Sequence, residues 1–179
     1  MRIDKLYLQN FRCYDELKLE FDKSMTVIVG ENGKGKTAIL DALAISLEPY
    51  LRAFGCKGRN MGERDVRRIK DAGDESVTRI LRMKSKYPVT IKVEGENAGE
   101  AMTWSRELKS ERGRTTSNNA KELSDYGKVL YEGINSVGDE KIVLPVLAYY
   151  GTSRMWNDSK LFNKSKKIDL PRSVGYEEC

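Results

Sequence analysis

Gly30-Glu31-Asn32-Gly33-Lys34-Gly35-Lys36-Thr37 is the stretch that decides the fold of this chain. It matches the pattern G-x-x-x-x-G-K-[ST] completely, directly after an apolar run and directly before a helical pattern. A polyphosphate must be surrounded by backbone N–H donors at close range, and glycines let the backbone bend around it because they lack Cβ. The positive end of the following helix points at the same anion. The sequence therefore predicts an α/β fold of the P-loop NTPase class.

Each side chain of this phosphate loop has an expected place around a bound nucleotide. Lys36 is expected to reach the β- and γ-phosphates and Thr37 to offer its hydroxyl to Mg²⁺, so these two are the candidate catalytic residues and Thr37 the metal ligand. Lys34 is expected to be solvent-exposed and to assist electrostatically, with Glu31 facing away from the phosphates. ATP and Mg²⁺ are the expected cofactors. The candidate cofactor-binding residues of the loop and helix start are Gly30, Asn32, Gly33, Lys34, Gly35, Lys36, Thr37 and Ala38.

The composition excludes much other chemistry. The chain has 179 residues and no histidine, which rules out Ser-His-Asp and Cys-His catalysis and every metal site that needs imidazole. Cys13, Cys56 and Cys179 form no CxxC pair, so neither a zinc knuckle nor a disulfide framework is indicated. No signal peptide is evident and no apolar run approaches the roughly 18 residues of a membrane helix. We expect a cytoplasmic protein that does not enter the membrane, and its net charge of +5 suits an anionic partner.

Hydrophobic periodicity predicts strands on both sides of the loop. The first two form an antiparallel hairpin, the next three after the loop could form a meander, and Met25–Val29 and Ile142–Tyr150 have the composition of buried strands. The predicted strands are Ile3–Leu8, Leu17–Phe21, Met25–Val29, Thr78–Met83, Val89–Glu94, Met102–Glu107 and Ile142–Tyr150.

Helical spacing predicts two helices. One runs from Lys36 to Phe54, and Pro49 inside it is expected to kink or shorten it. The other carries an apolar face made of Leu123, Tyr126, Leu130, Ile134 and Val137.

Between Arg52 and Lys70 the chain becomes glycine-rich and basic, which predicts a surface insertion or a loop with a short helix. The stretch contains only two acidic residues beside its basic ones. It is either a solvated loop or a contact for DNA or RNA phosphates. The aromatic residues near Tyr150 either stack on a base or pack in the core. The basic residues are Arg52, Lys57, Arg59, Arg64, Arg67, Arg68 and Lys70. As domains, residues 1–156 are expected to form one lobe and residues 157–179 a linker or the start of a further segment.

Three stretches give the sequence a specific family resemblance. Gln9-Asn10-Phe11-Arg12 lies between the first two predicted strands, and residues 27–43 read VIVGENGKGKTAILDAL. Together they resemble the opening of the ABC-type ATPase heads of the SMC, RecF and OLD group. Residues 147–156, LAYYGTSRMW, resemble bacterial predicted ATP-binding proteins, including the PtuA-like ATPases of anti-phage systems. The resemblance spans Met1 to Trp156.

The resemblance implies an ABC-ATPase-like N-terminal lobe with an antiparallel β portion and a helical insert. It places Asn10, Phe11 and Arg12 near the nucleotide, with Arg12 able to contact phosphate. The alternative is that Phe11 belongs to the core and Arg12 is a surface charge. Asp41 would be a structural residue of the first helix. Similar proteins carry a glutamine, close to Mg²⁺ and the attacking water, in the region where this chain has Tyr150 and the three residues after it.

Two motifs that complete such a head are absent from the sequence. Leu123-Ser124-Asp125 does not continue into an L-S-G-G signature loop, which in similar proteins caps ATP on the partner protomer. Asp139-Glu140 precedes an apolar run instead of ending it, so it is not a Walker B motif. Because phosphoryl transfer needs metal neutralisation and a positioned water, we expect the chain alone to bind ATP far better than it hydrolyses it.

The expected function is that of the ATP-binding N-terminal lobe of an SMC/RecF-like ATPase. ATP-dependent engagement of heads would control a nucleic-acid-directed activity in bacterial anti-phage defence. The expected partners are a second copy of the chain, a nuclease or other effector, and DNA or RNA. The alternative is a nucleotide-gated scaffold with little or no turnover. A transporter ATPase and a small P-loop kinase are disfavoured by the N-F-R stretch and by the two antiparallel strands before the loop.

Overall fold

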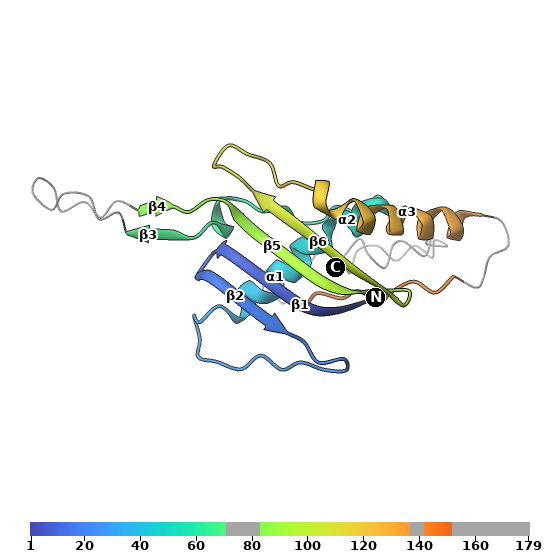
Figure 1. The fold of residues 1–179 in the computed structure, drawn as a ribbon, viewed down its shortest axis with the longest axis horizontal. Coiled ribbons are helices and arrows are strands. Elements are labelled where there is room, and N and C mark those ends of the chain that lie inside the picture. Colours follow the sequence, from blue (N-terminus) through green and yellow to red (C-terminus); the bar gives the residue numbers. More distant parts are fainter. Residues whose placement is uncertain (71–82, 137–141, 152–179) are drawn as a thin grey trace, which may run out of the picture.

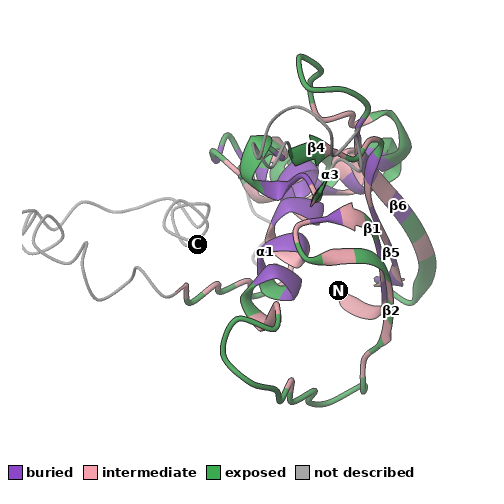
Figure 2. Cartoon of the chain, turned by 90° about the vertical axis from the view of Figure 1, so that its left-hand side faces the viewer, coloured by how far each residue is buried: buried purple, intermediate pink, exposed green. Residues whose placement is uncertain are grey.

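A computed structural model describes residues 1–70, 83–136 and 142–151 of the chain. Its centre is an antiparallel four-stranded sheet in the order β2-β1-β5-β6, with a layer of helices on one face (Figures 1 and 2). The strands are β1 (Arg2–Phe11), β2 (Tyr14–Glu20), β5 (Val89–Asn97) and β6 (Glu100–Leu108), and the helices are α1 (Lys36–Ser46), α2 (Glu48–Ala53) and α3 (Lys121–Asn135). Two short strands, β3 (Arg68–Lys70) and β4 (Met83–Ser85), form a second sheet, and the 3₁₀ helices are η1 (Glu63–Asp65) and η2 (Asn118–Ala120).

The predicted alternation along the strands decides which face of the sheet is buried. Leu6 pairs with Val93 and Leu8 with Ile91 across β1 and β5, and all four side chains face the helices. Neighbouring strand residues point to opposite faces, so the residues between them lie on the outer, solvated face. On that face, the ammonium groups of two lysines lie over the ring of Tyr7. The strands predicted on the N-terminal hairpin and around residues 89–94 and 102–107 are confirmed.

The predicted helix over residues 36–54 is interrupted, as the position of Pro49 predicts. α1 ends at Ser46, and α2 starts at Glu48 with Pro49 in its first turn, where a missing N–H does no harm. The carbonyls at the break are bound from β6. Trp104 Nε1 donates to the carbonyl of Ser46 at 3.0 Å, and an arginine of the same strand donates to the residue before it. The break in the helix therefore fixes α1 on the sheet.

Arg106 is that arginine, and it is fully buried. Its Nη1 contacts Glu48 Oε2 at 2.7 Å and the Ile45 carbonyl at 3.1 Å, while Nη2 donates to Asn60 Oδ1 at 2.6 Å and Nε to the Thr116 carbonyl at 2.9 Å. Burial lowers the pKa of Arg106, and the Glu48 carboxylate acts against this change. One guanidinium thus joins both helices, the segment after α2 and the segment after β6.

Two strand predictions are wrong in this structure. Met25, Val27 and Val29 are 70–87% exposed and residues 25–29 form no strand. Residues 142–150 form no strand either, and Val143 and Val146 are exposed. A strand forms only against a partner, and the sheets of the part of the chain that the structure describes place none beside either segment. An apolar pattern shows that a segment can pair, but it supplies no neighbour.

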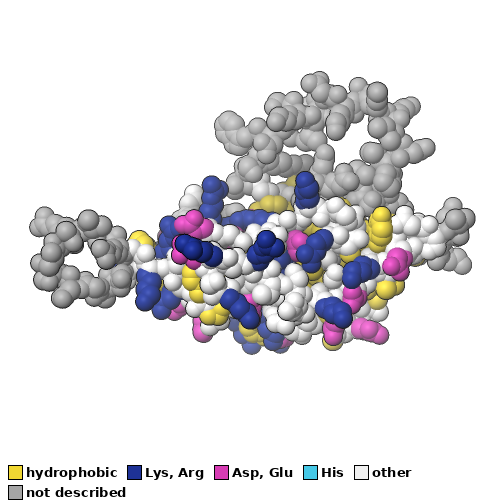
Figure 3. Space-filling model, turned by 90° about the horizontal axis from the view of Figure 1, so that it is seen from above, with side chains coloured by type: hydrophobic (Ala, Val, Ile, Leu, Met, Phe, Trp, Pro, Cys, Tyr) yellow, Lys and Arg dark blue, Asp and Glu magenta, His cyan; other side chains and the backbone are white. Residues whose placement is uncertain are grey.

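The expected surface insertion is partly internal. Met61 and Val66 are buried and belong to the core, and Phe11 forms an isolated β-bridge with Val66. The apolar residues of this stretch therefore hold it against the β1–β2 turn, while its charges stay outside. We call five exposed basic residues here and on the β3–β4 pair the basic patch: Arg64, Arg68, Lys70, Lys84 and Lys86. Figure 3 shows Lys and Arg side chains gathered at the end of the molecule where β3 and β4 lie.

Several predictions fall outside the described ranges. These are most of the strand over Thr78–Met83, the position of Val137, the aromatic Trp156 and the linker expected over residues 157–179. On the described helix α3, Leu123 is buried, and Tyr126, Leu130 and Ile134 pack against the core as predicted. Within residues 1–70, 83–136 and 142–151, no helix is long and apolar enough to span a membrane.

The buried pair of Arg106 and Glu48 predicts a large loss of stability when one partner is removed. Glu48→Ala leaves an uncompensated charge in the core, so we expect the free energy of unfolding to fall by about 3–5 kcal/mol in urea titrations. Arg52→Ala is the matched control, because exposed Arg52 pairs with the same carboxylate at 3.8 Å. That control is expected to change the free energy by less than about 1 kcal/mol. Equal effects of the two variants would contradict this account.

Candidate nucleotide site

The phosphate loop and the β1–β2 turn form a cavity of about 360 Å³. Helix α1 starts at its wall, so the first turn of the helix and the loop before it share the cavity with a turn that is distant in sequence. Among the residues that the structure describes, no acidic side chain lines it. The lining residues are Arg12, Cys13, Asn32, Gly33, Gly35, Lys36, Thr37 and Ala38.

Two glycines of the loop have conformations that other residues rarely adopt. Gly33 has φ +81° and Gly35 has φ +94°, both in the left-handed region. A Cβ on Gly35 would also stand 2.5 Å from Cys13 Sγ and 2.5 Å from the Tyr14 hydroxyl. Gly30 has neither constraint in this structure. Gly35 thus lets the loop pass directly under the β1–β2 turn.

The loop presents positive charge to the cavity. Lys36 folds back so that its Nζ donates to the carbonyls of Gly30 at 2.5 Å and Glu31 at 2.7 Å. The first N–H groups of α1 have no partner inside the helix, and its first turn holds no acidic residue to oppose its positive end. Lys34 and Glu31 point into solvent, 3.8 Å apart between Nζ and Oε2. Both side chains are thus exposed, as the sequence predicts.

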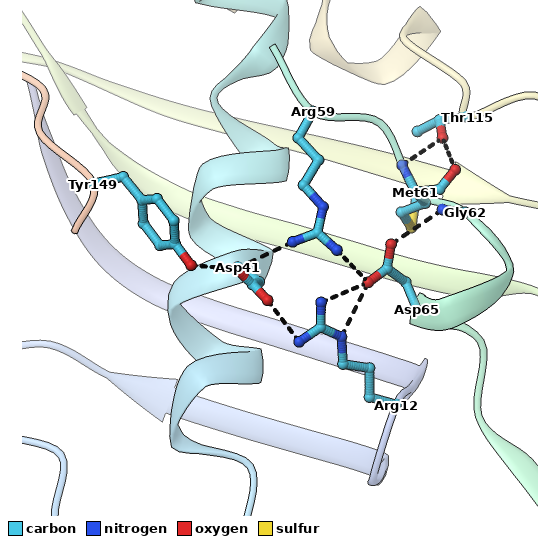
Figure 4. A network of polar contacts seen from close by, with 8 residues as sticks. All are labelled: Arg12, Asp41, Arg59, Met61, Gly62, Asp65, Thr115 and Tyr149. Atoms are coloured by element: carbon cyan, nitrogen blue, oxygen red, sulfur yellow. Dashed lines mark hydrogen bonds and ion pairs between the residues drawn. The ribbon is translucent and has the colours of Figure 1, made fainter. Parts of the chain in front are cut away.

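Arg12 brings a second positive group to the cavity from the β1–β2 turn. Its backbone is left-handed, with φ +51°, and its N–H donates to the Asp65 carbonyl at 2.9 Å. The guanidinium contacts two carboxylates, as Figure 4 shows. Nε and Nη2 donate to Asp65 Oδ1 at 3.0 and 2.8 Å, and Nη1 lies 2.6 Å from Asp41 Oδ2. Burial would lower the pKa of Arg12, but the hydrogen bonds to Asp65 and Asp41 outweigh it and raise that pKa.

The two carboxylates are shared with a second arginine. Arg59 Nη1 lies 3.1 Å from Asp41 Oδ1, and its Nη2 donates to Asp65 Oδ1 at 3.0 Å. The hydroxyl of Tyr149 also donates to Asp41 Oδ1, which ties the 142–151 segment to α1. Burial alone would raise the pKa of Asp41, but hydrogen bonds from Tyr149, Arg12 and Arg59 hold that pKa below its usual value. Asp41 is therefore an ionised structural residue, as the resemblance implies.

The structure separates the three residues of the N-F-R stretch. Of these, Arg12 lines the cavity. Phe11 is fully buried in the core and packs under the Arg12 guanidinium, which corresponds to the alternative reading of Phe11. The Asn10 amide donates to the Pro88 carbonyl at 2.8 Å. Sequence reasoning named Arg59 only as a basic residue of the insertion and placed neither Arg59 nor Asp65 at this site, because no spacing rule links residues 12, 41, 59 and 65 before the chain folds.

The arrangement fits an anionic ligand with several negative charges. It combines an ammonium, a guanidinium and helix N–H groups around one cavity, the donor set that phosphates require. For Mg²⁺ the cavity offers the Thr37 hydroxyl, and phosphate oxygens would supply further ligands. Across the described ranges, no group of three His, Cys, Asp or Glu side chains could hold a metal ion without them.

Comparison with known proteins shows the family to which the chain belongs. A family model described as an AAA domain, AAA_23, matches residues 5–178. The chain belongs to the AAA_23 family of AAA domains. The DNA replication and repair protein RecF of Oceanobacillus iheyensis is 31% identical to this AAA domain over 93 residues, which are 52% of this chain and 24% of RecF.

Two more relatives come from other organisms. The DNA double-strand break repair Rad50 ATPase of Thermococcus kodakarensis is 32% identical over 89 residues, 50% of this chain and 10% of Rad50. The structural maintenance of chromosomes protein 6A of Arabidopsis thaliana is 31% identical over 125 residues, 70% of this chain and 10% of that protein. The chain thus spans a quarter or less of the length of these three relatives. The predicted resemblance to SMC- and RecF-type ATPases is confirmed, and with it the α/β P-loop fold class.

A solved structure of an SMC ATPase, from work on ATP-driven dimerization and DNA-stimulated activation, also aligns with this AAA domain. The TM-score is 0.47 at 20% sequence identity, and the alignment covers 81% of this chain and 87% of that chain.

The backbone of Gly35 predicts a cost for any side chain at this position. Gly35→Ala is expected to lower the free energy of unfolding by about 1–3 kcal/mol, because the left-handed φ and the contact with Cys13 and Tyr14 both oppose a Cβ. Gly30→Ala is the control within the same loop and is expected to stay within about 0.5 kcal/mol of the wild type. Chemical denaturation measures both. A Gly35→Ala variant as stable as the control would show that the turn relaxes freely.

Proposed function

We propose that this AAA domain binds ATP with Mg²⁺ in the cavity beside α1, as the N-terminal lobe of an SMC/RecF-like ATPase. One observation supports this above all: Lys36, Thr37 and Arg12 line one cavity, whose described lining residues include no acidic side chain. Lys36 would bind the β- and γ-phosphates, Thr37 would hold Mg²⁺, and the N–H groups from Gly33 to Ala38 would surround the phosphate chain.

The proposed lobe relies on groups from elsewhere for hydrolysis. The described part of the cavity lining holds no carboxylate that could orient Mg²⁺ and water, and the sequence carries neither a Walker B nor a signature motif. Residues 30–34 are exposed, so a second surface could close over a bound nucleotide from that side. We therefore propose that the hydrolytic carboxylates come from outside this cavity lining. We also propose that two copies of the chain form a homodimer joined through ATP-bound heads.

The alternative, a nucleotide-gated scaffold, predicts ATP binding without turnover. Single-turnover hydrolysis by the intact polypeptide with Mg²⁺ separates the two functions. Phosphate release at a rate above background supports the ATPase, and stable ATP occupancy without release supports the scaffold.

The lysine of the phosphate loop provides the direct test of nucleotide binding. Lys36→Ala is expected to weaken ATP binding about 10- to 100-fold, since a hydrogen bond to a charged group contributes about 1.5–3 kcal/mol. Titration with a fluorescent ATP analogue measures the change. Lys34→Ala is the matched control. The sequence predicts Lys34 as a cofactor-binding residue, but its side chain points into solvent and is not among those that line the cavity, so the variant removes the same charge outside the cavity. We expect it to change affinity less than about threefold. Equal affinities of wild type and Lys36→Ala would disprove the assignment.

We further propose that ATP controls an activity on nucleic acid. The relatives' names refer to DNA replication, DNA repair and chromosomes, and this chain carries its basic patch at the end formed by η1, β3 and β4. Arg67, named with the basic residues of the insertion, is used differently. Its Nη1 donates to the Cys13 carbonyl and its Nε lies 3.5 Å from Asp15, so it anchors the β1–β2 turn.

Neutralising the basic patch is expected to weaken nucleic-acid binding and its dependence on salt. Arg64→Gln with Lys84→Gln and Lys86→Gln removes up to three phosphate contacts, so the slope of log affinity against log salt should fall by about 2–3 for duplex DNA. The control changes the same charge on the outer face of the sheet, at Lys5, Lys18 and Lys92, where glutamates alternate with the lysines. Identical slopes for both triple variants, or no binding by the intact protein, would remove the proposal.

A role in anti-phage defence is the most specific part of the proposal, and it rests on the likeness of residues 147–156 to PtuA-like ATPases. A nuclease or other effector would then act when ATP binds. Phage plaque counts on cells carrying the intact gene, with and without Lys36→Ala, test this role. Protection that survives the substitution would argue against ATP control.

A further inference from the structure

We propose that Asp41 and Asp65 are positioning residues that fix the Arg12 guanidinium on the cavity wall, in the orientation that receives a phosphate of the nucleotide. The inference rests on the proposed ATP site. It assigns a role to two acidic residues that do not themselves line the phosphate cavity.

The contacts of Arg12 leave part of its donor capacity for a ligand. A guanidinium has five N–H donors in a rigid plane. Three are used by Asp65 and Asp41, through Nε, Nη2 and Nη1. One N–H on each terminal nitrogen remains after these contacts, on a side chain that lines the phosphate cavity. Each of these two N–H groups can donate a charge-assisted hydrogen bond to a phosphate oxygen.

Asp65 is itself held rigidly. Its side chain is 2% exposed, and Oδ2 accepts a hydrogen bond from the Gly62 N–H at 3.1 Å. The backbone carbonyl of the same residue accepts the N–H of Arg12, so side chain and main chain of Arg12 bind one residue. The next residue, Val66, forms the bridge with Phe11. Two adjacent residues of each segment are thus fixed against each other.

Asp41 connects Arg12 to the helix that begins the phosphate site. Thr37 and Asp41 are four residues apart on α1, so they lie on the same face, one turn from each other. An arginine bound to Asp41 is therefore held at a fixed distance from the helix N-terminus. Arg59 and Tyr149 hold the other oxygen of Asp41, which keeps the carboxylate in place when Arg12 also contacts a ligand.

When one carboxylate is neutralised, the added positive charge and the lost positioning of Arg12 predict opposite changes in ATP affinity. The two arginines and two aspartates carry no net charge, so Asp65→Asn adds one positive charge near the cavity and favours an anion by electrostatics alone. Asparagine also has one acceptor oxygen where aspartate has two, so it cannot keep both the three hydrogen bonds that order the two arginines and the one from the Gly62 N–H. A freed arginine must lose its rotamer freedom again on binding. If positioning dominates, the variant binds ATP more weakly in spite of its added positive charge.

The test measures ATP binding by the full chain as Asp65→Asn, Arg12→Ala and the double variant. We expect Asp65→Asn to weaken binding about fivefold, Arg12→Ala by about tenfold, and the double variant to bind no more weakly than Arg12→Ala within about twofold. Non-additivity of this kind shows that Asp65 acts through Arg12, which a general loss of stability would not produce. Glu63→Gln is the matched control, because exposed Glu63 lies two residues away and the charge change is the same.

Other outcomes separate this inference from the proposed function. ATP binding that is unchanged or tighter in Asp65→Asn, or losses that add in the double variant, would overturn the positioning role. Asp41→Asn provides a second variant with the same expected coupling to Arg12, for use if Asp65→Asn does not fold. An Arg12→Ala variant with wild-type affinity, beside a Lys36→Ala variant that has lost it, would refute the inference and leave the ATP site intact. No effect of Lys36→Ala would refute the site itself.

Discussion

The packing of α1 against the antiparallel sheet is the interaction on which the rest of the structure depends. Leu6 and Ile91 of the sheet and Ala42 and Ile45 of the helix are all buried in one core. Burial of such side chains is the main favourable term in folding, and here it also places the start of the helix beside the β1–β2 turn. The proposed phosphate site, made from a helix end and a distant turn, depends on these two layers staying together.

Two arginines secure this packing at different points of the helix layer. Arg106 comes from the sheet and binds the carbonyl of Ile45 and the carboxylate of Glu48, where the helix breaks. It is fully buried and satisfied by protein groups alone, so its role is structural. Arg12 binds Asp41 nearer the start of the helix and also lines the cavity. The guanidinium of Arg106 thus serves only the fold. The guanidinium of Arg12 serves the fold and also remains available to a ligand, because of the two only Arg12 has access to solvent.

Charge is distributed in three ways across the molecule. On the outer face of the sheet, lysines and glutamates alternate across the strands, which gives a solvated surface with little net charge. Around Arg12 and Arg59 two carboxylates balance two guanidinium groups. At η1, β3 and β4 the exposed side chains of the basic patch far outnumber the acidic ones, with Glu63 bound to Arg68. A net charge of +5 is therefore less informative than the place where the excess lies.

The sequence alone determined the phosphate loop, the start of α1, the break at Pro49 and the alternation that builds the four-stranded sheet. Each follows from local physics: glycine conformations, a missing proline N–H, and the two-residue period of a strand. The tertiary structure decided which arginines and aspartates meet, because contacts between residues 12, 41, 59 and 65 depend on how distant segments pack. It also decided that Met25–Val29 stays unpaired in the described ranges, although its pattern is that of a strand. A strand's backbone hydrogen bonds belong to two segments at once, so one segment's sequence cannot determine them.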